Sequence, residues 1–112
     1  MGRRNIAEAI TAAGIPCVHM AWLEGQAPNL PWAVFYIDET DGMYADNRVK
    51  TKITNWVVEL YQHQADEELE EALELSIQDS FGPYRKTEAW VDDEQCLMTA
   101  YYFTEIEGVQ NG

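Results

Sequence analysis

Residues Lys50 to Asp79 join an alternating, strand-like pattern to an acidic, helix-like pattern through a short turn, and this unit organises the predicted fold. Successive strand side chains point to opposite faces, and β-branched and aromatic residues dominate the first half of the unit. One predicted face carries Ile53, Val57 and Tyr61, and the other carries Trp56, Val58 and Leu60. Because both faces are apolar, we expect this strand to lie in the centre of a sheet.

The second half of the unit predicts an amphipathic helix that begins after Asp66. Asp66 is suited to cap the helix, and the carboxylates that follow it suit the positive end of the helix dipole. The apolar stripe, at spacings of three and four, is Leu69, Ala72, Leu73, Ser76 and Ile77. The acidic face is Glu67, Glu70, Glu71 and Glu74. Leu75 is the one large apolar residue on this acidic side, so it is a candidate interface residue.

The rest of the chain predicts one more helix and four more strands. The helix opens at Asn5, which has capping-box spacing to Glu8, and ends at Gly14. The predicted strands are Cys17–Leu23, Trp32–Asp38, Tyr84–Val91 and Gln95–Ile106. The order helix, strand, strand, strand, helix, strand, strand predicts an α+β fold, with a mostly antiparallel sheet and both helices on one face.

The length of 112 residues predicts a single domain, 1–112, in which the tail 108–112 is flexible. The polar stretch from Glu39 to Lys50 predicts a projecting loop or a loosely paired hairpin arm, with Met43 and Tyr44 exposed near its tip. Met43, Tyr44 and Trp22 are further candidates for contacts with another subunit or a partner, since Met and aromatic residues are enriched at interfaces.

The composition argues against several function classes. A net charge of −13 disfavours independent binding to nucleic acid or to an anionic membrane. The sequence contains no phosphate-binding loop, nucleophile motif or metal-ligand spacing, so we expect no catalytic residue, no cofactor and no metal site. No apolar run is long enough to span a bilayer. Cys17 and Cys96 are expected to be reduced, buried thiols.

Four stretches together resemble the tail terminator, or tail completion, proteins of long-tailed, non-contractile bacteriophages. They are Leu30–Tyr36 (LPWAVFY), Tyr44–Tyr61 (YADNRVKTKITNWVVELY), Glu67–Leu75 and Tyr84–Gly108 (YRKTEAWVDDEQCLMTAYYFTEIEG). The resemblance covers the chain from about Ile6 to Glu107. It rests on the order of elements and on short stretches such as YADN followed by an alternating strand.

The resemblance implies a structural, non-enzymatic protein of the virion tail or neck, assembled in the host cytoplasm. It implies a homo-oligomer, a six-membered ring that caps the tail tube, ends its polymerisation and provides the surface for head–tail joining. The implied partners are the tail tube protein and a head–tail connector or neck protein. DNA is expected to pass through the ring without specific binding.

The acidic helix has several interpretations. No Lys or Arg occurs between Lys52 and Arg85, so no base lies near these acids in the sequence. In a ring, Glu67, Glu70, Glu71 and Glu74 are candidates for an acidic face that lines the DNA channel and repels the duplex. The helix could equally be a solvated outer rim. The alternative function is an acidic inhibitor, a DNA mimic that binds a DNA-binding protein of host or phage.

Overall fold

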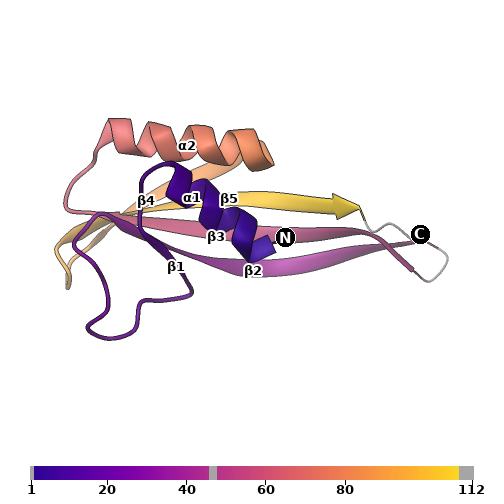
Figure 1. Cartoon of the computed structure of the whole chain (residues 1–112), viewed down its shortest axis with the longest axis horizontal. Helices are drawn as coiled ribbons and strands as arrows, with labels where there is room; N and C mark the ends of the chain where they lie inside the picture. The colour runs from indigo at the N-terminus through magenta and orange to yellow at the C-terminus, as the bar shows by residue number, and fades with distance from the viewer. Residues whose placement is uncertain (1, 46–47, 109–112) are drawn as a thin grey trace.

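The computed structural model describes the backbone of residues 2–45 and 48–108 and the side chains of residues 2–39 and 52–107. Two helices cover one face of a five-stranded sheet (Figure 1). The elements are α1 (Gly2–Ala12), β1 (Cys17–His19), β2 (Trp32–Ala45), β3 (Arg48–Gln62), α2 (Glu67–Phe81), β4 (Tyr84–Val91) and β5 (Cys96–Gly108). The strand order is β1-β2-β3-β5-β4, and all neighbours are antiparallel except β1 and β2. The predicted α+β fold is confirmed.

Strand β3 is the middle strand of the sheet, as its two apolar faces predicted. Trp56, Val58 and Leu60 lie in the core beneath the helices. That core consists of Ile6, Ile10, Ile15, Ala33, Phe35, Trp56, Val58, Leu60, Leu73, Ile77, Tyr101 and Phe103. Residues from α1, α2 and three strands thus meet on one face of β3, and their burial is the main driving force for packing the helices on the sheet.

The opposite face of the sheet has no helix, yet part of it is buried. Val57 is only 1% exposed and lies between Tyr36 and Tyr102 in the ladder. The hydroxyls of Tyr36 and Tyr61 donate to the two carboxylate oxygens of Glu59, at 2.7 and 2.8 Å. Large aromatic side chains therefore surround Val57, and hydrogen bonds to the Glu59 carboxylate hold Tyr36 and Tyr61 in place.

The predicted ends of both helices are confirmed in part. The Asp66 carboxylate accepts a hydrogen bond from the backbone N–H of Leu69 at 3.2 Å, so Asp66 caps α2 as expected. Gly14 has a φ of 82°, a left-handed conformation that glycine adopts at low cost, and it follows the end of α1. The prediction that Asn5 caps α1 is wrong, because α1 begins at Gly2. The Asn5 amide instead donates to the Glu105 carboxylate at 3.5 Å.

The first two strands differ in length from their predictions. Strand β1 ends at His19 because Met20 has a φ of 73° and turns the chain away from the sheet. Strand β2 continues past Asp38 to Ala45 and pairs with β3. Residues 39–45 therefore form a hairpin arm with residues 48–55, which is the second of the two predicted alternatives, because their backbone groups find partners across the ladder.

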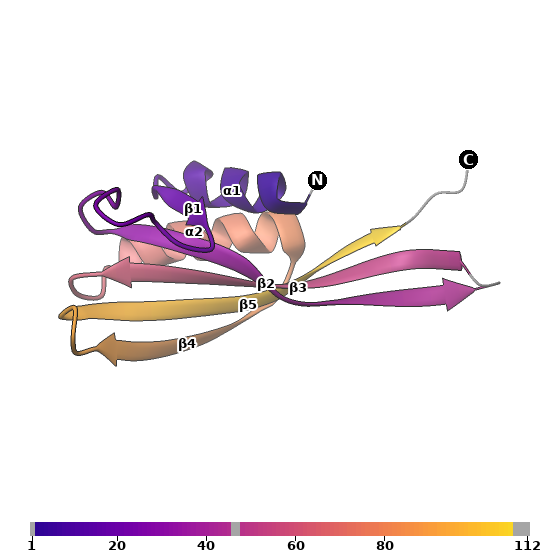
Figure 2. The same cartoon turned by 90° about the horizontal axis from the view of Figure 1, so that it is seen from below.

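The sheet is longer than the helices that cover it. We call the uncovered part the arm: residues 38–45 of β2, 48–55 of β3 and 104–108 of β5 (Figure 2). The arm contributes to principal extents of 51 × 28 × 22 Å. The predicted flexible tail starts at the last residue of β5, and 109–112 lie outside the described residues.

Replacing Trp56 by Asp tests the central position of β3. Trp56 is 2% exposed and its indole N–H donates to Glu105 at 3.2 Å. The change buries a charge and removes a large aromatic contact, so we expect a loss of about 4 kcal/mol or more in the free energy of unfolding. Urea unfolding measures it, with Trp90→Asp as the control, because Trp90 is 53% exposed. An unchanged melting temperature for Trp56→Asp means that the strand is misplaced.

Candidate assembly surface

Lys86 of β4 joins the acidic helix α2 to the edge of the sheet. Its Nζ lies 2.8 Å from Glu70 Oε1 and 2.8 Å from Glu74 Oε2. The Tyr101 hydroxyl also donates to Glu74 Oε2 at 2.8 Å, and the Gln62 amide donates to Glu70 Oε2 at 3.1 Å. Glu70 is only 6% exposed. The predicted four-residue acidic face is therefore wrong for Glu70 and Glu74, which turn toward the sheet and share one lysine.

These contacts change the proton affinities of the cluster. Burial alone raises the pKa of Glu74, but hydrogen bonds from Lys86, Tyr101 and Tyr84 and the charge of Lys86 outweigh burial, so its net pKa is lowered. Burial alone lowers the pKa of Lys86, but the hydrogen bonds and charges of Glu70 and Glu74 outweigh it and raise the pKa overall. Both groups are therefore held in their charged forms around neutral pH.

The acids that remain exposed on α2 are fewer than the sequence suggests. Glu67, Glu68 and Glu71 are exposed on the described surface. That Glu67 and Glu71 line a DNA channel stays a prediction. Leu75 is 60% exposed, as its place on the acidic side of the helix predicted. It borders a shallow hollow of about 260 Å³, together with Glu71, Gln78 and Tyr84.

Trp22 is less available for contacts than the sequence suggests. Its ring is half-buried and packs edge-on against Trp32, with 6.1 Å between ring centroids, and Trp32 in turn packs on Tyr61 at 4.7 Å. The more exposed apolar residue of the same loop is Leu23, at 78%. The sequence placed Leu23 in a strand, where a buried side chain is the usual expectation, and so it was missed.

The other two candidate interface residues lie at the tip of the arm. In the β2–β3 ladder, Met43 pairs with Thr51 and Tyr44 pairs with Val49. Their side chains lie outside the described residues. Nearer the helices, Ile106 of the arm is 68% exposed, and Ile37, just before the arm begins in β2, is 37% exposed. The alternating pattern of β5 could have identified Ile106, because it continues beyond the residues that the helices cover.

A groove of about 640 Å³ runs where the arm meets the helices. Its apolar lining includes Ala9 and Ala12 of α1, Phe81 at the end of α2 and Ile106 of β5. Its polar lining includes Asn5, Glu8, Ser76, Ser80, Glu105 and Glu107. Exposed apolar residues and a partly apolar groove therefore adjoin at the base of the arm, which is typical of a surface that another protein covers.

Within the described parts of the chain, no three His, Cys, Asp or Glu residues come close enough together to hold a metal ion. Among the same residues, no helix is long and apolar enough to cross a membrane. Cys17 and Cys96 are both free thiols, the first half-buried and the second buried. No model of a known protein family matches the chain, and no curated protein matches it either.

Replacing Lys86 by Met tests the cluster. The change leaves the buried Glu70 carboxylate without its cation, so we expect the free energy of unfolding to fall by about 1–3 kcal/mol at pH 7. The lowered pKa of Glu74 stabilises the fold above its unfolded pKa of about 4.3, and the raised pKa of Lys86 does so below about 10.4. The difference between wild type and variant should thus persist between these limits and shrink as the pH falls below about 4.

Urea unfolding across this pH range measures the effect. Arg85→Met is the matched control, because Arg85 is the exposed neighbour on the other face and forms no ion pair among the described side chains. Equal losses in both variants would show that the Lys86 ion pairs do not stabilise the fold.

Proposed function

We propose that this chain is a structural protein that assembles into a ring at the end of a phage tail tube. The ring ends the polymerisation of the tube and provides the surface on which head and tail join. The observation that supports this most is the arm, where the sheet extends past both helices and has uncovered faces (Figure 2). The resemblance to tail terminators, from about Ile6 to Glu107, supports the choice of a tail tube as the site of this assembly.

The arm is the part of the sheet that no helix covers, and its exposed apolar side chains require a physical explanation. Antiparallel sheets tolerate solvent on one face, and in this chain the helices cover only part of the other face. At the base of the arm, Ile37 and Ile106 expose apolar surface on opposite faces of the sheet. Their burial by another subunit would contribute about 25 cal/mol per Å² of apolar surface, which a solitary chain does not gain.

The acidic composition suits such an assembly. A net charge of −13 keeps single copies apart and soluble until specific contacts form. It also means that DNA passing through a ring is not captured, since phosphate binding needs clustered Lys and Arg. The proposed partners are therefore other copies of the chain, the tail tube protein and a neck protein, with DNA as a transient passenger.

Deleting the gene in the phage that carries it tests this function directly. We expect heads filled with DNA but not joined to tails, and tails of abnormal length, because nothing stops tube growth. Electron microscopy of lysates measures both. Supplying the intact chain from a plasmid should restore joined particles of normal length. Empty heads, or normal virions without the chain, would contradict a role in tail completion.

Leu75 tests whether the outer surface of α2 takes part in assembly. Leu75→Glu adds a charge at an exposed position, so the monomer should remain folded, with a melting temperature close to that of wild type. If Leu75 is covered in the ring or at its docking site, self-association or tube capping should weaken by about tenfold or more. Ala72 was predicted on the apolar stripe but is exposed in the structure, so Ala72→Glu adds the same charge at another exposed position of α2 and is the matched control. Unchanged assembly of Leu75→Glu would make Leu75 an ordinary surface residue.

The acidic-inhibitor function gives the opposite results in these experiments. A DNA mimic would bind a DNA-binding protein tightly as a single copy, and its binding would weaken when exposed acids are neutralised. The structure reduces the number of such acids, because Lys86 engages Glu70 and Glu74. Stoichiometric capture of a DNA-binding protein, together with normal tails in the deletion mutant, would favour this alternative.

A further inference from the structure

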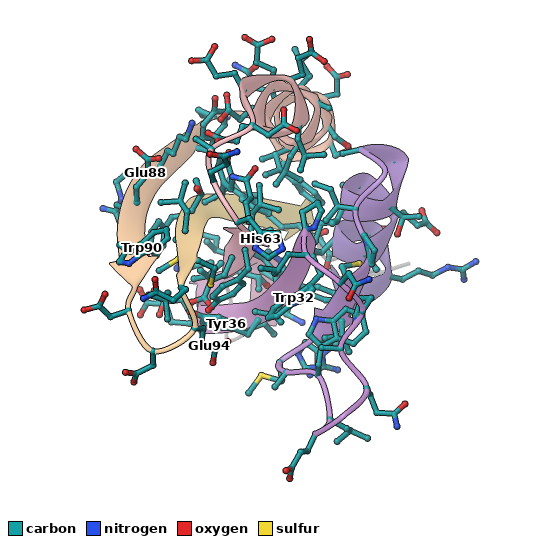
Figure 3. All side chains as sticks on the ribbon, turned by 90° about the vertical axis from the view of Figure 1, so that its left-hand side faces the viewer. Trp32, Tyr36, His63, Glu88, Trp90 and Glu94 are labelled. Carbon is teal, nitrogen blue, oxygen red and sulfur yellow. The ribbon has the colours of Figure 1, made fainter. Side chains whose placement is uncertain are left out.

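The sheet ends in two unpaired edges. On one side, β4 pairs only with β5, and six of its eight residues are exposed. On the other side, β1 pairs with β2 only at 33–35, so β2 is unpaired on that side from Tyr36 onward among the described residues. Figure 3 looks along the strands and shows Glu88 and Trp90 of β4 at the left, and Trp32 and Tyr36 of β2 below the middle of the view. Such edges present free backbone donors and acceptors to another chain.

The directions of these strands suit pairing between copies. The series β2, β3, β5, β4 is antiparallel at each step, so β2 and β4 run in opposite directions. When a second copy lies beside the first in the same orientation, β4 of one copy is antiparallel to β2 of the next. The contact joins two different surfaces, and repeating it by rotation closes a ring.

The β4 edge carries an exposed cation, and the free β2 edge begins with exposed carboxylates. Arg85 of β4 is exposed, and its guanidinium lies 4.7 Å from the centre of the Tyr102 ring. It forms no ion pair with any side chain that the structure describes. Asp38 and Glu39, at the start of the free edge of β2, are both exposed. In such a contact, the exposed Arg85 of one copy can therefore meet exposed carboxylates of the next.

Arg85 and Glu39 also belong to the same face of the sheet. Arg85 pairs with Tyr102 and Tyr102 with Val57, while Glu39 pairs with Asn55, two residues from Val57 on β3. Residues two apart on a strand share a face, so both side chains lie on the helix-free face. Only residues on the same face can become cross-strand neighbours.

We infer that the ring closes by antiparallel pairing of the β4 edge with the free β2 edge of a second copy, with Arg85 beside Glu39. This inference rests on the proposed function, because it names the surface through which the ring forms. About five residues, from Tyr84 to Glu88, can join the ladder before β4 meets β1 of the neighbour, which is the length of a typical strand.

A pair of charge reversals tests the contact. Arg85→Glu and Glu39→Arg each place like charges at every interface, so each variant alone should lose self-association by about tenfold or more. In an equimolar mixture, opposite charges meet again at every interface between the two variants, because one variant is acidic at both positions and the other is basic at both. The mixture should therefore form rings in which the two variants alternate and are present in equal numbers. Native mass spectrometry resolves the composition, because the variants differ in mass.

Three comparisons make the result decisive. Arg4→Glu changes the charge equally on α1, where Arg4 pairs only with Glu8 among the described residues, and should not affect ring formation. Arg85→Gln removes the charge without reversing it and should give an intermediate loss, provided that melting curves show folded protein. If wild type forms rings but the mixture does not, the proposed edge contact is wrong. The same holds if each charge-reversed variant forms rings alone. In both cases the proposal that the chain forms a ring still stands. If wild type forms no ring, free or on tail tubes, both the contact and the proposed function are wrong.

Discussion

The burial of β3 on both faces is the constraint on which the rest of the structure depends. On one face, Trp56, Val58 and Leu60 form the floor on which both helices pack. On the other face, Val57 is enclosed by aromatic side chains of the sheet itself, without a helix. Because aromatic side chains of the sheet bury the helix-free face, two helices on the other face are enough to bury β3. The strand can therefore continue beyond the helices into the arm.

Lys86 is the second contact that shapes the molecule. Edge strand β4 is largely exposed and pairs with a single neighbour, so ladder hydrogen bonds alone hold it weakly. The ion pairs from Lys86 to Glu70 and Glu74 tie this strand to α2 and neutralise part of the acidic helix. A lysine between two carboxylates leaves a net charge of −1. Gln62 donates to the second oxygen of Glu70, and Tyr101 donates to the same Glu74 oxygen that Lys86 contacts. The edge of β4 that faces away from β5 remains unpaired, although β5 and α2 hold the strand in place.

The sequence predicted what depends on local patterns and missed what depends on distant partners. Alternation in residues 53–61, the Asp66 cap and the strand 84–91 are local, and the structure has them as expected. The ends of β1 and β2 are not local: Trp22 packs on Trp32 and leaves the strand pattern, whereas residues 39–45 gain backbone partners from β3. Glu70 and Glu74 are the clearest case in the site, because their cation is 16 and 12 residues away and comes close only when β4 folds back beside α2.

Net charge and assembly oppose each other in this chain. Six copies in one ring would carry a formal charge of −78, from six times −13, and this charge resists association over any distance that salt does not screen. At physiological ionic strength, screening limits the repulsion to about 8 Å, so contacts within that range decide the outcome. The seven basic residues lie on α1, on the arm and on β4, with Arg85 and Lys86 next to each other. Lys86 neutralises acids within its own copy, which leaves Arg85 as the cation at the edge. A strongly acidic chain can thus stay apart from its copies at long range and still pair at an edge where a cation meets carboxylates.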